Sequence, residues 1–474
     1  MSSYWSTKSR PHYRSASAGH RAAPVSNPTP QTPPPPFGAL LQTLKIEDLA
    51  VSSKKFVNSA TIEDVEVITS YNWLDKKGAE PTILIPGKPP RWTPPLTSPQ
   101  LSQDDGNYFR DKNAARYPKH PIEPGVVACL DADPALPSKV DIMACSSTLG
   151  NLLRFVRGSG EDKPFRMLVE KVGNTIFFIR RENSPTELIP DVRGYGHTFP
   201  EAYTTWEADV KGSCSHQRLL RYSFGGLNCV VRFGADGYIS PAGWSAPHSA
   251  STANEKKPSV DDLINTLSGI SVPSPDIEPS KGTLKVEKAG TAVDQRDVFD
   301  LKTRSIWTKL KKDHLADELP RLWVAQIPYF ILAFHQSGFF APNEIQIKNV
   351  RKKVKVWEKN QATHLASLAA LIHRIIDVVS AKPSRKIELR CCETGKLEVR
   401  ERLADAGEIL SPGVRSRWEG EWEKGALSEK GDPDSEDEPY WDDRDDQLSW
   451  DEGSEKDFTA CSADDCGYCG HCPY

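Results

Sequence analysis

Hydrophobic residues along the chain follow two different periods, and each period predicts its own kind of element. Met167–Val172 and Thr175–Arg181 are apolar runs joined by Gly173-Asn174, which predicts a β-hairpin. Apolar and polar residues alternate through Leu219–Phe233, as in a strand with one buried face. From Gln361 to Val379, apolar side chains recur every three or four residues and predict an amphipathic helix.

The other predicted elements alternate between helix and strand. We expect a helix over His197–Val210, a short strand at Val298–Thr303, a basic strand at Ile345–Val356 and a closing hairpin at Lys386–Arg400. Such alternation is typical of an α/β domain, in which a central mixed β-sheet is flanked by helices. The pattern therefore predicts one mixed α/β (α+β) domain over residues 140–410.

Composition marks four stretches that differ from this domain core. Residues 1–36 end in a proline run and predict a disordered lead-in, whereas residues 37–139 predict a proline-rich region that wraps around the core. Residues 241–293, rich in Ser, Pro and Lys, predict a flexible insertion within the domain. Residues 411–474 predict a disordered acidic tail.

The formal charge of -4 hides an asymmetry between body and tail. Residues 429–465 carry 16 acids and 3 bases, a net of -13, so the remaining residues carry +9. A basic body favours a polyanionic partner. Two basic clusters, Lys309–Lys312 and Lys348–Lys355, would track phosphates or simply form solvated faces. We also expect the acidic tail to cover a basic groove when the polyanionic partner is absent.

One constellation of charged residues is split across the predicted insertion. Asp236 follows an apolar strand, and Asp300-Leu301-Lys302 lies within another, where residues two apart share a face. Two carboxylates on neighbouring strands can hold a divalent metal, and an adjacent lysine can orient a water molecule. This is the pattern of PD-(D/E)XK nucleases. The alternative is an ordinary strand with a surface ion pair.

Glu201 is a candidate third carboxylate. It lies in the first turn of the helix that Gly196–Glu201 opens, from which it would point toward the metal. The competing interpretation is a capping box, because Thr198 and Glu201 have the spacing of that motif and an early glutamate favours the helix dipole.

The order of these segments resembles the eukaryotic decapping nuclease / decapping exoribonuclease family, which removes defective 5′ ends from RNA. Six segments carry the resemblance, namely Asp141–Leu153, Phe165–Glu182, Gly196–Glu201, Phe233–Asp236, Phe299–Thr303 and Ile327–Phe334. The resemblance implies a PD-(D/E)XK-like fold and metal-dependent hydrolysis at the RNA 5′ end. It also implies RNA as partner, together with an exoribonuclease.

The resemblance assigns roles to individual residues. Glu201, Asp236 and Asp300 would hold Mg²⁺ or Mn²⁺, and Lys302 would position the attacking water. Arg154, Arg193 and Arg232 are the candidate ligands of the substrate phosphate.

Three departures from the family pattern favour an alternative. Gly234 stands where the family has a glutamate, Asp300 is shorter than the expected glutamate, and Ser146 replaces the family's phosphate-binding arginine. The alternative is a catalytically inactive, RNA-binding pseudonuclease or scaffold.

Two further motifs lie near the C-terminus. Cys461, Cys466, Cys469 and Cys472 offer enough thiolates for one tetrahedral Zn²⁺, although their spacing is compressed for such a site. Asp442–Asp446 matches the Asp-Asp-x-x-Asp pattern of prenyl diphosphate synthases. That function is a remote alternative, because those enzymes are all-helical and carry two such motifs.

Location is predicted from what the sequence lacks. We see no run of 18 apolar residues and no apolar segment of a secretory signal, so we predict no membrane association. Scattered cysteines outside the tail suit a reducing compartment, and we expect an intracellular protein of the nucleus or cytoplasm.

Overall fold

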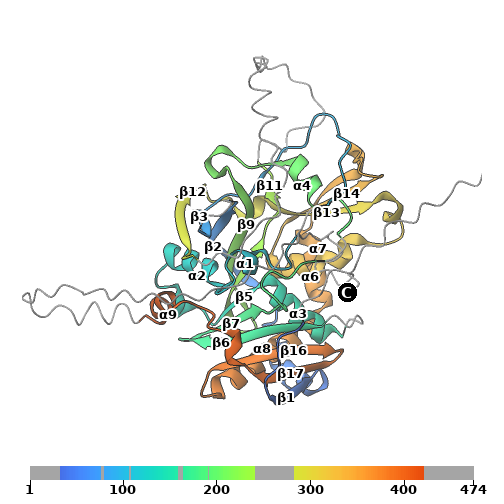
Figure 1. The fold of residues 1–474 in the computed structure, drawn as a ribbon. Helices are drawn as coiled ribbons and strands as arrows, with labels where there is room; N and C mark the ends of the chain where they lie inside the picture. Colours follow the sequence, from blue (N-terminus) through green and yellow to red (C-terminus); the bar gives the residue numbers. More distant parts are fainter. Residues whose placement is uncertain are drawn as a thin grey trace, which may run out of the picture. The chain divides into compact units, whose positions relative to one another are not determined.

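The structure is a computed structural model of the chain. It describes residues 33–75, 80–105, 108–158, 164–189, 192–240 and 282–420. The predicted mixed α/β class is confirmed, because two mixed β-sheets and their flanking helices make up the described residues (Figure 1). Both predicted disordered ends fall largely outside this part of the chain, as do residues 241–281 of the predicted insertion.

The larger sheet contains eleven strands of the described chain. Their spatial order is β1 (Leu40–Lys45), β17 (Lys396–Glu401), β16 (Lys386–Glu393), β6 (Phe165–Val172), β7 (Thr175–Arg180), β5 (Ile142–Cys145), β10 (Leu227–Gly234), β9 (Ser213–Phe224), β2 (Glu63–Leu74), β3 (Thr82–Pro86) and β12 (Lys285–Ala289). The predicted hairpin at Gly173 is present, and so is the closing hairpin of β16 and β17.

The run Leu219–Phe233 is two strands and not one. Gly225 and Gly226 form a turn with φ of 60° and 79°, and β9 pairs antiparallel with β10 on either side of it. A two-residue turn with both φ angles positive matches the twist of a hairpin and is readily adopted by Gly-Gly. The turn brings the end of β10, and with it Gly234, opposite Gln217 of β9.

The smaller sheet contains six described strands, in the order β15 (Ile345–Asn349), β14 (Tyr329–His335), β13 (Val298–Ser305), β11 (Gly237–Tyr238), β4 (Arg91–Trp92) and β8 (Thr204–Thr205). β13 and β14 are parallel and are joined through α6 (His314–Ala325), which forms a β-α-β unit. β11 pairs antiparallel with β13, with Gly237 opposite Phe299. This pairing places Asp236 beside the middle of β13.

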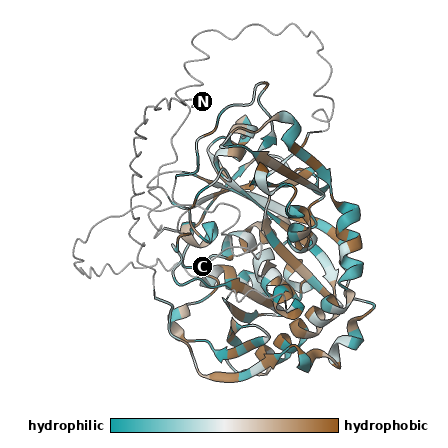
Figure 2. Ribbon diagram, turned by 90° about the vertical axis from the view of Figure 1, so that its right-hand side faces the viewer, coloured by the Kyte–Doolittle hydropathy of each residue, from teal (hydrophilic) through white to brown (hydrophobic). Residues whose placement is uncertain are grey.

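The remaining helices of the described chain are short, except for one. They are α1 (Lys112–Arg116), α2 (Glu123–Ala132), α3 (Ser146–Arg157), α4 (Thr198–Tyr203), α7 (Arg351–Asn360), α8 (Ala362–Ala381) and α9 (Pro412–Glu419). Coloured by hydropathy, the strands are largely brown, and the helices show alternating teal and brown turns (Figure 2). This is the pattern of amphipathic helices packed on apolar sheets.

Helix α8 confirms the helix predicted over Gln361–Val379. By length and composition alone it could cross a membrane, since its mean hydropathy is 1.4 over 18 residues. The expectation drawn from counting unbroken apolar runs missed this. In the structure, Leu365, Leu368 and Leu371 are buried in the main core together with strands of the larger sheet. Helix α8 is therefore a core helix of this domain.

Several predicted boundaries shift. Residues 37–139 supply β1–β4 and part of the core, including Tyr71 and Trp73 (both 0% exposed), so this region is part of the domain and does not merely wrap around it. Order extends through α9 to Gly420, and β12 lies within the predicted insertion. The helix predicted over His197–Val210 ends at Tyr203, and the strand predicted over Ile345–Val356 becomes α7 after Asn349.

Candidate active site

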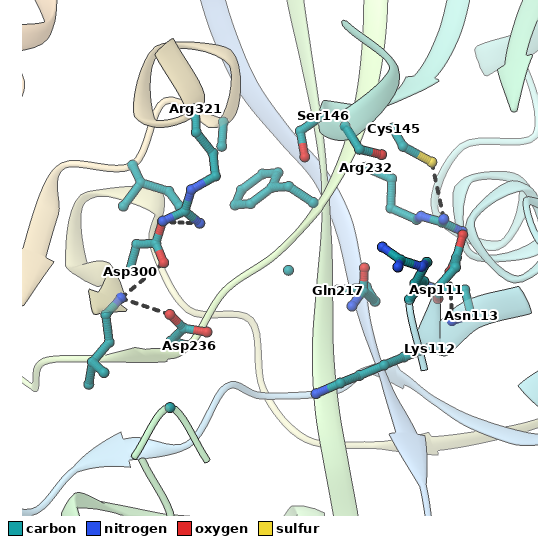
Figure 3. A pocket seen from close by; sticks show the side chains of 18 of the residues that line it. Asp111, Lys112, Asn113, Cys145, Ser146, Gln217, Arg232, Asp236, Asp300 and Arg321 are labelled. Atoms are coloured by element: carbon teal, nitrogen blue, oxygen red, sulfur yellow. Dashed lines mark hydrogen bonds and ion pairs between the residues drawn. The ribbon is translucent and has the colours of Figure 1, made fainter. Parts of the chain in front are cut away.

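A pocket of about 350 Å³ lies where the two sheets approach each other (Figure 3). It is lined from α1, the β5–α3 junction, β9, β10, β13 and α6. Its charged lining residues are Arg110, Asp111, Lys112, Arg180, Arg232, Asp236, Asp300, Lys302 and Arg321. Six of these nine are basic, so the pocket suits an anionic ligand.

Asp236 and Asp300 converge on one backbone amide. The Leu301 N–H donates to Asp236 Oδ2 at 2.7 Å and to Asp300 Oδ1 at 2.9 Å. Asp236 comes from the loop between β10 and β11, and Asp300 from the middle of β13. Residues 64 positions apart thus place two carboxylates together in the pocket, as Figure 3 shows.

The Asp300 carboxyl is only 2% exposed. Burial raises its pKa well above 3.8, the neighbouring Asp236 raises it further, and Arg321 and Lys302 oppose the shift. Arg321 Nη1 forms an ion pair with Asp300 Oδ2, an oxygen that is buried and accepts no hydrogen bond. Asp300 therefore keeps its proton to a higher pH than an exposed aspartate does.

Lys302 lies two residues after Asp300 on the same strand and is 7% exposed. Both residues line the pocket, as does Leu301 between them, but the side chains of Leu301 and Phe299 are buried in a small apolar core with Ile331. This alternation is the one expected from the period of a strand.

Glu201 is not brought together with the other two carboxylates. It lies on α4 with its side chain exposed, and the residues that line the pocket there are His197 and Pro200. Although the side chain is largely exposed, partial desolvation of the carboxyl raises its pKa, Asp104 raises it further, and Lys112 opposes this shift.

The start of α4 is not capped by the predicted Thr198–Glu201 box. Asp104, from a distant loop, accepts hydrogen bonds from the Thr198 amide and hydroxyl, each at 3.0 Å. This frees Glu201 from any capping role.

The three candidate phosphate ligands lie in different places. Arg232 lines the pocket, and its guanidinium donates to Pro121 O at 2.7 Å and to Cys145 Sγ at 3.1 Å. Arg154 packs over the Phe165 ring at 5.9 Å, and Arg193 is exposed; neither is among the residues that line the pocket. Of the three, the geometry favours Arg232.

Arg321, Lys112 and Gln217 line the pocket and were not anticipated. Figure 3 places Arg321 with Asp300 and Asp236 at one end, and Lys112 with Asn113 and Arg232 at the other, with Gln217 between them. No local motif marks these residues. For Arg321, the sequence offered one indirect signal, the β-α-β arrangement that returns α6 across β13.

Two carboxylates are what the site offers to a divalent cation. In the part of the chain that the structure describes, no three His, Cys, Asp or Glu side chains are grouped closely enough to hold a metal. Mg²⁺, however, is commonly held by one or two carboxylates with substrate phosphates and water completing its shell. The pair fits one ion of this kind through Asp236 and Asp300 Oδ1, because Arg321 already pairs with Asp300 Oδ2.

The zinc candidates Cys461, Cys466, Cys469 and Cys472 lie outside the described residues, as does Asp442–Asp446. The prenyl synthase alternative requires an all-helical fold, and two large β-sheets disagree with it.

Comparison with known proteins gives a family match and several similar folds. The model of a family described as "Domain of unknown function (DUF8563)" matches residues 42–389. No curated protein matches the sequence.

Among solved structures, the chain is similar to Scheffersomyces stipitis Rai1 in complex with (3'-NADP)+ and calcium ion. The TM-score is 0.48 at 11% identity, over 82% of this chain and 100% of that one. For S. pombe Rai1 in complex with 3'-FADP, the TM-score is 0.46 at 10% identity, over 76% of this chain and 99% of that one. For Candida albicans Rai1 in complex with pU5-Mn2+, the TM-score is 0.45 at 10% identity, over 77% of this chain and 98% of that one. These proteins belong to the decapping group that the sequence motifs resemble. At such identities the likeness does not extend to individual side chains.

Proposed function

The chain belongs to the family described as domain of unknown function DUF8563, and we propose that it is a metal-dependent nuclease acting on the 5′ end of RNA. One observation carries the proposal: Asp236 and Asp300 share the Leu301 amide in the pocket that also contains Lys302. Two carboxylates and a lysine in this arrangement are what metal-assisted phosphodiester or pyrophosphate hydrolysis requires.

Each residue has a defined task in this proposal. When bound between Asp236 and Asp300, Mg²⁺ or Mn²⁺ would supply Lewis-acid polarisation of the phosphoryl oxygen. The Lys302 ammonium orients the attacking water and favours its deprotonated form. Arg321, held by Asp300 and by Glu318 at 3.0 Å, adds a fixed positive charge near the developing negative charge.

The opposite end of the pocket suits the substrate's phosphates. Lys112 is exposed on α1, and Arg232 is a buried cation whose guanidinium donates to Pro121 O. Helix α3 begins at Ser146 without a side-chain cap, and Ser146 and Ser147 line the pocket. Terminal phosphates at an RNA 5′ end carry the charge that such a surface recognises.

The test uses the purified full-length protein with Mn²⁺ and either 5′-triphosphorylated or capped RNA. We expect release of the 5′ group or of nucleotides, and we expect Lys302→Ala to abolish it. Lys285→Ala is the matched control, because Lys285 lies on the edge strand β12 and pairs with Glu287 at the surface. Hydrolysis that survives Lys302→Ala would contradict the proposed mechanism.

A second candidate is a pseudonuclease that binds RNA without cleaving it. The specific observation in its favour is Arg321, a protein cation already paired with Asp300, in a site where Gly234 supplies no carboxylate. Binding of the same RNAs with no products at any Mn²⁺ concentration would favour this candidate. An exoribonuclease partner and a nuclear or cytoplasmic location remain predictions in either case.

A further inference from the structure

A second hollow lies between α6 and α7 and shares no lining residue with the candidate site. It has a volume of about 310 Å³ and is lined by Leu319, Lys352, Lys353, Val356, Trp357 and Asn360. We call it the α6–α7 groove. Val356 is 56% exposed, an unusual state for a valine on a helix, and Trp357 forms part of the wall while packing on Trp323 at 5.6 Å.

The rim of the groove is strongly basic. Helix α7 carries five basic residues and one acid, and Lys352 and Lys353 are both exposed at the groove itself. Lys353 and Lys309 lie near enough to Lys348 to lower its pKa, in addition to the effect of burial. Clustered like charges raise the free energy of the domain unless an anion screens them.

An apolar floor with a lysine rim fits a segment that combines acidic and aromatic residues. The C-terminal tail of this chain has that composition. Residues 436–452 contain nine acids and one base, and Tyr440, Trp441, Leu448 and Trp450 lie among them. The carboxylates of this segment complement the lysines at the rim of the groove, and an indole side chain complements its apolar floor.

The length of chain between groove and segment is sufficient. Helix α9 ends at Glu419, and Trp441 follows 22 residues later. An extended chain of that length spans up to about 70 Å. A domain of about 390 residues has a radius of gyration of only about 21 Å.

We propose that the acidic-aromatic segment 436–452 docks in the α6–α7 groove of its own chain, with an indole on Val356 and carboxylates on Lys352 and Lys353. This inference does not depend on the nuclease proposal. It gives the segment a route to the candidate site, because Leu319 in the groove and Arg321 in the site belong to the same helix. Docking would also cover the basic face of α7.

The test is zero-length carbodiimide cross-linking of the full-length chain, which joins carboxylates to amines in contact, followed by mass spectrometry. We expect tail carboxylates to be joined to Lys352 and Lys353 more often than to Lys54 and Lys55. The latter are an exposed lysine pair within the short 3₁₀ helix Ser52–Phe56 and serve as the matched control.

Two variants probe the apolar contact without removing the cross-linked lysines. Val356→Asp and the pair Trp441→Ala with Trp450→Ala should each reduce these cross-links about fivefold, the effect of losing about 1 kcal/mol of apolar contact. The proposal would be overturned if Lys54 and Lys55 were cross-linked to the tail as often as Lys352 and Lys353. It would also be overturned if Val356→Asp left the number of cross-links unchanged. Cross-links found only between chains, in a mixture of ¹⁵N-labelled and unlabelled protein, would show a second copy as the occupant and would also overturn it.

Discussion

Arg321 of α6 forms an ion pair with Asp300 of β13 at the centre of the candidate site. Arg321 also pairs with Glu318 at 3.0 Å, and Glu318 in turn lies 3.6 Å from Arg304. Asp300, Glu318 and both arginines are largely buried, so bulk water screens their charges only weakly. A cation supplied by the protein therefore occupies part of the space in which the proposed metal would meet Asp300.

We predict that Arg321→Gln strengthens Mn²⁺ binding about tenfold. Removing a fixed positive charge beside a dication lowers their repulsion, and even at an effective dielectric constant near 20 this is worth more than 1 kcal/mol. Mn²⁺ affinity is measured by titration with electron paramagnetic resonance. Arg296→Gln is the matched control, because Arg296 pairs with Asp294 on the exposed surface. An unchanged or weaker affinity in Arg321→Gln would place the metal away from Asp300.

We predict that Lys112→Ala weakens RNA binding without changing stability. Lys112 is exposed at the phosphate end of the pocket and contributes no buried contact. Losing one phosphate contact should reduce the slope of log affinity against log salt by about 0.7, as expected for single-stranded RNA. Lys119→Ala is the control, since Lys119 is equally exposed and lies just beyond α1. A slope that falls equally in both variants would show that general charge, and not this pocket, binds the RNA.

We predict an acid-dependent contribution of Glu207 to stability. The Lys88 ammonium lowers the pKa of Glu207 below 4.5, and Tyr238 OH donates to it at 2.9 Å, which fixes β11 next to Asp236. A carboxyl with a lower pKa in the folded state stabilises the fold fully above the unfolded value, and this contribution is lost as pH falls through the folded value. Glu207→Gln should therefore cost about 1 kcal/mol at pH 7 and almost nothing near pH 3.

Urea unfolding at both pH values measures this difference. Glu47→Gln, in an exposed turn, is the control and should leave the midpoint unchanged at either pH. A Glu207→Gln effect that persists unchanged at pH 3 would show that its contacts do not depend on ionisation.

The sequence predicted the parts of this site that depend on local period. Asp300 and Lys302 share a strand face because a strand alternates, and Asp236 follows a strand whose end could be read from Gly234 and Gly237. The fold class and the hairpins β6–β7 and β16–β17 were predicted for the same reason. Each hairpin signal lies within 15 residues of chain, and the fold class follows from the alternation of such local signals.

Long-range packing decided the rest. Arg321 reaches Asp300 because α6 returns across β13, and no sequence pattern indicates that these two residues are in contact. Asp104 caps α4 from a loop more than 90 positions away, which removed the capping role assigned to Glu201. Residues 37–139 seemed peripheral because prolines interrupt their apolar runs, yet β2 pairs with β9 inside the larger sheet.

Gly234→Glu should convert this site into a better metal site. A Cβ at Gly234 would meet Gln217 Nε2 at 3.5 Å and His216 O at 3.8 Å, which are ordinary contacts, and the backbone there does not require glycine. The position lines the pocket two residues before Asp236, so a glutamate would add a third carboxylate to the pair. We expect Mn²⁺ affinity to rise at least tenfold, since each added anionic ligand contributes more than 1 kcal/mol in such a site. Gly234→Gln has the same shape without the charge and should leave affinity near that of the wild type. If both variants bind Mn²⁺ alike, the carboxylates do not form a metal site, and the pseudonuclease becomes the better account of this protein.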